Sequence, residues 1–199
     1  MSLLNNPARY GSVAMTLHWL IALLIICNIC SGFYFNNVLG DNDPLRFTLV
    51  QLHKPMGLTV LVLSVVRLIW RLVNKVPELP RGMSLPLRWL AHGTHYLFYI
   101  LIIGIPLVGW AMVSASRTGI PTSYFGLFQW PNISYFADMA APDKSHYRHM
   151  LGNLHAELAY GAAVLLVLHV GAALYHHYYR HDTVLKRMLP GTKVEETPA

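Results

Sequence analysis

Charged residues are scarce in this sequence. Only 12% of the 199 residues are Asp, Glu, Lys or Arg, about half the share that a soluble globular domain carries. Hydrophobic residues make up 54% of the chain. This composition excludes an ordinary soluble domain and indicates an integral membrane protein.

Cysteine is rare as well, since Cys27 and Cys30 are the only two in the chain. Both fall in the middle of an apolar run, where hydrocarbon surroundings disfavour the reactive thiolate. We interpret both as small packing residues. The sequence therefore predicts neither a C-x-x-C redox pair nor a disulfide.

Long hydrophobic runs are abundant. Four runs approach or exceed the roughly 20 apolar residues that cross a bilayer, at residues 13–35, 47–70, 89–114 and 154–177. Turn-forming residues or a long polar segment, residues 117–151, separate them. We predict an all-α membrane protein whose single domain, residues 1–199, is a four-transmembrane-helix up-and-down bundle. The first run lacks a cleavage site for a signal peptide, so we expect it to be retained.

The basic residues are distributed unequally between the two sides of this bundle. Ten of the fifteen lie on the side that holds both termini: Arg9, Arg67, Arg71, Lys75, Arg81, Arg88, Arg180, Lys186, Arg187 and Lys193. The positive-inside rule therefore predicts that both termini are cytoplasmic. Anionic lipid accounts for the net charge of +6, so we expect the lipid bilayer as a partner and no nucleic acid.

Histidine is the most informative residue type, with eleven copies. Because consecutive spans run in opposite directions, His53 and His155 are expected in the outer leaflet. Five others are expected in the inner leaflet, namely His18, His92, His95, His169 and His176. His146, His149 and His181 are expected in loops. The intramembrane imidazoles therefore form two layers.

The spacing on the fourth span relates the two layers. Fourteen residues separate His155 from His169, which gives about 21 Å of rise and about 1,400° of rotation, close to four full turns. Both rings therefore leave nearly the same helix face. Imidazole pairs from facing helices, at two heights, are the arrangement that holds two haems edge to edge across a membrane. With both axial positions filled, such a centre transfers electrons and binds no gas.

Two other interpretations of these histidines exist. Each ring could form a structural hydrogen bond between helices, or the layers could form a zinc or proton-relay site. Metal transport usually adds intramembrane carboxylates, and the spans offer only Glu157. We place Glu157 near a helix start, where it would complement the helix dipole.

Four segments carry a resemblance to a known family: YGSVAMTLHWL, QLHKPMGLTVLVLSVVRLIWRL, AHGTHYLFYILIIGIPLVGWAM and LHAELAYGAAVLLVLHVGAALYHHYYRHDTVLKRMLP. Over about residues 8–190 the chain resembles the bacterial cytochrome b561 family of diheme inner-membrane proteins. The resemblance implies two haems b, with axial ligation of the iron by His18 with His169 and by His53 with His155. Spacing alone leaves His18, His92 and His95 open as the partner of His169.

One kind of protein in this family is a superoxide oxidase, which passes electrons from periplasmic superoxide to ubiquinone. The similarity puts His95 and His176 where that kind contacts ubiquinone, and a histidine can supply protons to a quinone carbonyl. Lys54 directly follows His53 and is our candidate for steering the superoxide anion. Further basic residues lie on that side at Arg46, Arg117, Lys144 and Arg148, with Asp41, Asp43, Asp138 and Asp143 against them.

The alternative function is an electron-conduit cytochrome b subunit that links a partner dehydrogenase or a periplasmic donor to the quinone pool. Residues 117–150 bear on this choice, because their aromatic side chains suit either a lid over the outer haem or a docking patch for a redox partner. These aromatics are Tyr124, Phe125, Phe128, Trp130, Tyr135 and Phe136. We expect a lid.

Overall fold

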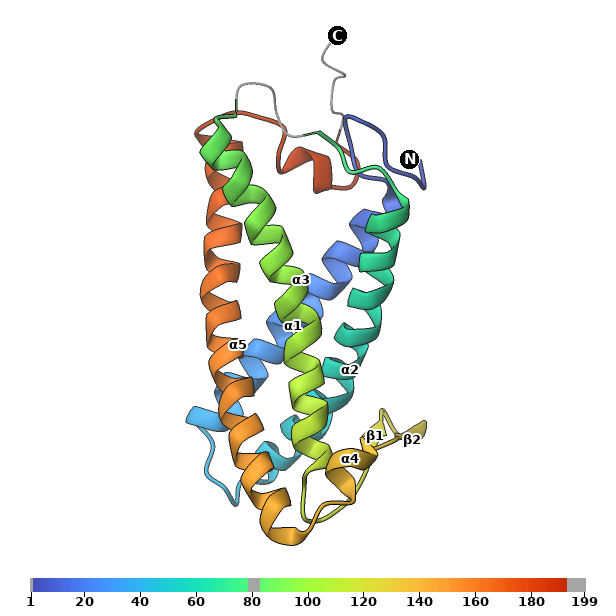
Figure 1. Ribbon diagram of the computed structural model, residues 1–199. Helices are drawn as coiled ribbons and strands as arrows, with labels where there is room; N and C mark the ends of the chain where they lie inside the picture. Colours follow the sequence, from blue (N-terminus) through green and yellow to red (C-terminus); the bar gives the residue numbers. More distant parts are fainter. Residues whose placement is uncertain (1, 79–82, 193–199) are drawn as a thin grey trace. The chain divides into compact units, whose positions relative to one another are not determined.

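Four long helices dominate the computed structural model, which describes residues 2–78 and 83–192 (Figure 1). They are α1 (Ser12–Asn37), α2 (Pro44–Val73), α3 (Leu85–Ser114) and α5 (Ala141–Tyr178). Each is long and apolar enough to cross a membrane. The all-α class and the four spanning helices are therefore confirmed, and Arg81 and Lys193 of the charge count lie outside the described residues.

Shorter elements occupy the connections. Strands β1 (Thr122–Tyr124) and β2 (Phe128–Trp130) form an antiparallel hairpin in which Thr122 pairs with Trp130. Its turn contains Gly126 at φ +78°, a left-handed conformation that favours glycine. A one-turn helix, α4 (Ser134–Ala137), follows the hairpin, and a 3-10 turn, η1 (Lys186–Met188), lies in the C-terminal tail.

Local sequence explains where α2 and α5 begin. Pro44 opens α2, and its fixed φ suits the first helical turn. The Asp43 carboxylate accepts a hydrogen bond from the Leu45 backbone N–H at 2.8 Å, which satisfies one of the free donors at the helix start. Helix α5 has Pro142 and Asp143 in its first turn, where a carboxylate complements the helix dipole.

The start of α5 corrects the predicted fourth span. The helix begins at Ala141 rather than at residue 154, so His146 and His149 are helical and the prediction of a loop for them is wrong. Glu157 lies well inside α5 and is exposed, so its assignment to a helix start is wrong too. Hydropathy detects only the part of a helix that lies in hydrocarbon, and the first turns of α5 are polar.

The described chain forms two compact units, and every long helix contributes a segment to each. Within residues 2–78 and 83–192, the first unit consists of residues 2–21, 63–78, 83–100 and 162–192, and the second consists of residues 22–62 and 101–161. The intramembrane histidines divide between them. His18, His95 and His169 belong to the first unit, whereas His53 and His155 belong to the second.

Apolar side chains are distributed as in a membrane protein. Met15 and Ile21 are buried in the first unit, and Leu58 and Val60 are buried in the second. Along α5, in contrast, many large apolar side chains are exposed, including Val164, Val167 and Leu168. Exposed aliphatic side chains on a spanning helix are suited to contact with lipid chains.

Within the first unit, Arg9 and Trp19 bond to the segment that follows α5. The Trp19 indole N–H donates to the Met188 carbonyl at 2.8 Å, and the Arg9 guanidinium donates to the Leu189 carbonyl at 2.8 Å. These bonds fasten the C-terminal tail against the start of α1.

Candidate functional site

Three imidazoles from three helices meet in the first unit. The ring centroid of His169 on α5 lies 6.3 Å from that of His18 on α1 and 6.2 Å from that of His95 on α3. Phe98 lies against the same ring at 5.1 Å. His92 is exposed. The geometry therefore keeps both His18 and His95 as neighbours of His169, and the separation alone does not choose between them.

A second imidazole pair lies in the second unit. The ring centroids of His53 on α2 and His155 on α5 are 6.1 Å apart. The Nδ1–H of His155 donates to the Ile105 carbonyl at 3.0 Å, which fixes the ring and leaves Nε2 free to bind a metal. Phe35 packs against the other ring, with 5.4 Å between its centroid and that of His53.

Glycines on neighbouring helices make room for both rings of this pair. A Cβ atom at Gly109 would lie 3.0 Å from Cε1 and 3.1 Å from Nδ1 of His155, and a Cβ atom at Gly32 would lie 3.3 Å from Cε1 of His53. These separations are tighter than an ordinary van der Waals contact. Gly32 and Gly109 therefore let the two imidazoles approach the backbone of α1 and α3. Sequence reasoning missed this role, because the glycines carry no polar group.

The pairs fit the axial ligation of a haem. A metal held from opposite sides by two imidazoles, with metal–nitrogen bonds of about 2 Å, places the ring centroids about 6 Å apart, as found in both units. The buried Nδ1 atoms of His18 and His53 have no hydrogen-bond partner among the described residues, so both rings have a nitrogen available. Paired ligands suit a haem better than a tetrahedral zinc ion.

Comparison with known proteins decides the family. The family model described as "Prokaryotic cytochrome b561" matches residues 9–191. The chain belongs to this family. It is therefore a multi-pass membrane protein that binds b-type haem and transfers electrons, which confirms the resemblance inferred from the four quoted segments.

Individual relatives of this cytochrome b561 cover nearly its whole length. "Cytochrome b561 homolog 2" of Escherichia coli (strain K12) is 32% identical over 189 residues, which are 95% of each chain. "Probable superoxide oxidase CybB" of Yersinia pestis is 28% identical, covering 92% of this chain and 96% of its own. "Cytochrome b562" of Cereibacter sphaeroides is also 28% identical, covering 94% of this chain and 98% of its own.

His176 of this cytochrome has a carboxylate partner that sequence reasoning missed. Its Nδ1–H donates to Oδ2 of Asp182 at 2.5 Å, and the other carboxylate oxygen, Oδ1, accepts from the Val184 backbone N–H at 3.0 Å. Asp182 thereby fixes the imidazole and leaves its Nε2 available to another group. Asp182 follows the end of α5 by a few residues, so its proximity to His176 depends on the turn of the chain beyond the helix.

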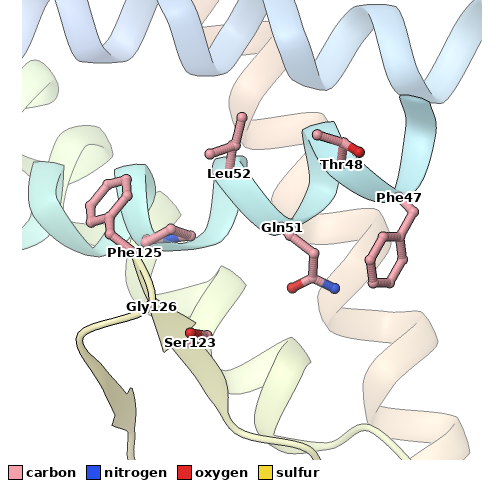
Figure 2. A pocket seen from close by; sticks show the side chains of 8 residues that line it. Phe47, Thr48, Gln51, Leu52, Ser123, Phe125 and Gly126 are labelled. Atoms are coloured by element: carbon pink, nitrogen blue, oxygen red, sulfur yellow. The ribbon is translucent and has the colours of Figure 1, made fainter. Parts of the chain in front are cut away.

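Lys54 lies beside a groove in the second unit. Its Nζ donates to Oε1 of Gln51 at 3.4 Å, and Gln51 lines a groove of about 500 Å³ between α2 and the hairpin. Figure 2 shows the Gln51 amide pointing from α2 into this space, with Phe47 next to it and the strand of Ser123 opposite. Lys54, which directly follows His53 in the sequence, therefore bonds to the wall of the groove. Arg46, in contrast, pairs with Asp41 at 3.4 Å.

Two hydrogen bonds connect the hairpin region to α2 and α3, while its turn is exposed. The Tyr124 and Thr59 hydroxyls are hydrogen-bonded at 3.0 Å, and the Trp110 indole N–H donates to the Pro131 carbonyl at 2.8 Å. In the turn, Phe125 and Leu127 are 47% and 78% exposed, and Phe128 at the start of β2 is 49% exposed. The hairpin thus presents apolar side chains outward while it also borders the groove beside Lys54.

Proposed function

We propose that this cytochrome b561 oxidises superoxide at the periplasmic side of the bacterial inner membrane and reduces ubiquinone at the cytoplasmic side. The observation that carries the proposal is the presence of one imidazole pair in each unit, His18 with His169 at 6.3 Å and His53 with His155 at 6.1 Å. Each pair would ligate one haem b, and both termini would be cytoplasmic. The name of the Yersinia pestis relative, "Probable superoxide oxidase CybB", supports the choice of substrate.

The stoichiometry needs two electrons. Two superoxide anions release two electrons and two molecules of dioxygen, and ubiquinone takes up both electrons and two protons to become ubiquinol. Two bound haems supply one-electron carriers that together hold both electrons. His18 with His169 and His53 with His155 would hold the two haems, which would supply the one-electron chemistry between superoxide and ubiquinone.

On the periplasmic side, Lys54 would attract the superoxide anion. The Lys54 residue is half-buried, and its Nζ donates to Gln51, which lines the groove. A positive charge in such a position is less screened than one on an exposed loop. Among the other basic residues of this side, Arg46 already has a carboxylate partner. We choose Lys54 for steering because it directly follows His53 in the sequence and bonds to a residue that lines the groove.

On the cytoplasmic side, His95 and His176 would contact ubiquinone and supply its protons. The His95 ring lies next to that of His169, so a quinone bound at His95 would be close to the first-unit pair. Asp182 would hold the His176 ring while Nε2 exchanges a proton with the quinone carbonyl.

The activity is tested with purified protein, ubiquinone and superoxide generated enzymatically. We expect haem reduction faster than spontaneous dismutation removes the radical, followed by ubiquinol formation. Lys54→Ala should slow haem reduction chiefly at low ionic strength, whereas the control Lys144→Ala, on the same predicted side, should change the rate much less. A rate that the protein leaves unchanged would rule out this activity, and an equal loss at all salt concentrations would rule out steering by Lys54.

The exposed turn of the hairpin favours one alternative, an electron conduit for a redox partner. Exposed aromatic and aliphatic side chains at Phe125, Leu127 and Phe128 form a patch of the kind found at protein interfaces. Purification in mild detergent distinguishes the two functions. A stoichiometric dehydrogenase partner, together with no response to superoxide, would identify the conduit.

A further inference from the structure

Two arginines of α2 contact the same tyrosine ring in the first unit. The guanidinium carbon atoms of Arg67 and Arg71 lie 5.9 Å and 5.8 Å from the ring centroid of Tyr99 on α3. The two side chains are one helical turn apart on the same face of α2. They are directed toward a neighbouring helix of the unit, and the tyrosine ring contributes a cation–π contact to each.

This pair of cations lacks a carboxylate partner in the described part of the chain. The ion pairs found there are Arg46 with Asp41 and His176 with Asp182. Both arginines are half-buried in a helix able to span the membrane. Two like charges in such surroundings repel each other and are costly to remove from water, so an anion beside them would stabilise the cluster.

The cluster lies at the edge of the first-unit histidines. Arg67 is near enough to His18, His95 and His169 for their charges to interact, and Arg71 is near enough to His95. An anion held by these arginines would therefore belong to whatever molecule the histidines bind, or would lie directly beside it.

We propose that Arg67 and Arg71 bind the two propionate carboxylates of the haem held by the first-unit histidines. Haem b carries both carboxylates on one edge of the macrocycle, so two guanidinium groups match its charge. The planar fork of each arginine suits a carboxylate. The proposal rests on the haem that the proposed function assigns to this unit. An anionic phospholipid offers the same oxyanion chemistry through its phosphate.

Arg67 would also tune this haem. Positive charge beside a haem stabilises the reduced form, since reduction adds an electron. Removing the charge of Arg67 should therefore shift the reduction potential of this haem downward and leave the other haem unchanged. A lower potential would make this haem a stronger reductant toward ubiquinone.

The experiment uses the full-length protein loaded with haem that is ¹³C-labelled at its propionate carboxylates. The variants are Arg67→Gln, Arg71→Gln and Arg67→Lys, and the matched control is Lys75→Gln, which changes an exposed lysine two residues beyond α2. Redox-induced infrared difference spectra report the labelled carboxylates. A redox titration, haem quantitation and a phosphate assay of bound phospholipid accompany them.

We expect Arg67→Gln and Arg71→Gln to shift the labelled carboxylate bands and to lower one of the two potentials, with no change in Lys75→Gln. Arg67→Lys should preserve most of the potential. Loss of one haem in Arg67→Gln but not in Arg67→Lys would also support binding of the propionates by the positive charge. The haem that remains in Arg67→Gln would show that this variant has folded.

Unchanged carboxylate bands in both glutamine variants would overturn the inference, and a simultaneous loss of bound phosphate would identify a phospholipid as the anion instead. This failure is distinct from a failure of the proposed function. Wild-type protein with fewer than two haems per chain would contradict the two-haem assignment itself, whereas two haems with unchanged bands would contradict only the role of the arginines.

Discussion

The His155 ring occupies the space that a side chain at residue 109 would fill, because residue 109 is glycine. Because a Cβ atom there would lie 3.0 Å from the ring, Gly109→Ala should displace the imidazole and destabilise the second-unit site by about 1–3 kcal/mol, the usual cost of overpacking. Thermal unfolding and haem content per chain measure this effect.

Gly104 provides the control for this substitution on the same helix. A Cβ atom at Gly104 meets nothing within 4 Å, and alanine is favoured over glycine in a helix interior by about 1 kcal/mol. Gly104→Ala should therefore keep the haem and leave stability equal or higher. Equal behaviour of the two variants would show that the ring does not need the space at Gly109.

Asp182 gives a second prediction at the residue scale. Asp182→Asn keeps the Oδ1 acceptor for the Val184 N–H but replaces Oδ2 by an amide that cannot accept from His176. The turn should persist while the imidazole loses its orientation. We expect kcat for ubiquinone reduction to fall by up to about 100-fold, the lower range of general acid–base contributions, with KM and haem content unchanged. A raised KM with normal kcat would indicate a purely structural residue.

The sequence predicts the helix face on which a residue lies when helical periodicity alone determines that face. The face shared by His155 and His169 follows from their spacing, and both rings meet another imidazole in the structure. Gly109, Gln51 and Asp182 were missed because their roles arise from contacts between segments. The distances do not decide which histidine is the partner of His169, because His18 and His95 are nearly equidistant from it.

At the scale of elements, hydropathy predicted the first three spans to within a few residues. The fourth was predicted too short, because the polar residues 141–153 continue α5 without the hydrophobicity that marks a span. The hairpin was also missed as an element. Its strands have three residues each, too few for an alternating pattern to be recognised, and its aromatic side chains were interpreted as a lid or a docking patch.

A buried serine at the end of α3 bonds to the segment that follows the hairpin. The Ser114 hydroxyl donates to the Trp110 carbonyl at 2.8 Å and accepts from the Ile133 backbone N–H at 2.9 Å. Ser114→Ala would leave the Ile133 N–H without this acceptor, at a cost of about 1–3 kcal/mol. Hydrogen exchange of the amides at residues 122–133 should accelerate.

Ser116 is the matched control for this prediction. Its hydroxyl bonds only to that of Thr118, in an exposed position, so Ser116→Ala should leave the exchange of the hairpin amides unchanged. If Ser114→Ala also leaves it unchanged, the hairpin is held by its other contacts, those of Tyr124 and Trp110.

At the scale of the whole molecule, the charge distribution predicts the orientation in the membrane. Both termini and the connection between α2 and α3 carry most of the basic residues, which favours the cytoplasm. A fluorescent protein fused after residue 199 should fluoresce, and alkaline phosphatase inserted at residue 42 should be active. The reverse pattern would place the groove beside Lys54 in the cytoplasm and would contradict periplasmic capture of superoxide.

The account depends most directly on two haems held by two imidazole pairs, which haem quantitation per chain tests together with reduced-minus-oxidised spectra. Wild-type protein should contain two haems. His155→Ala should lose the haem of the second unit, and His169→Ala should lose that of the first, so the two variants should retain one haem each with different spectra and potentials. One haem or none in the wild type, or two haems in either variant, would contradict the account.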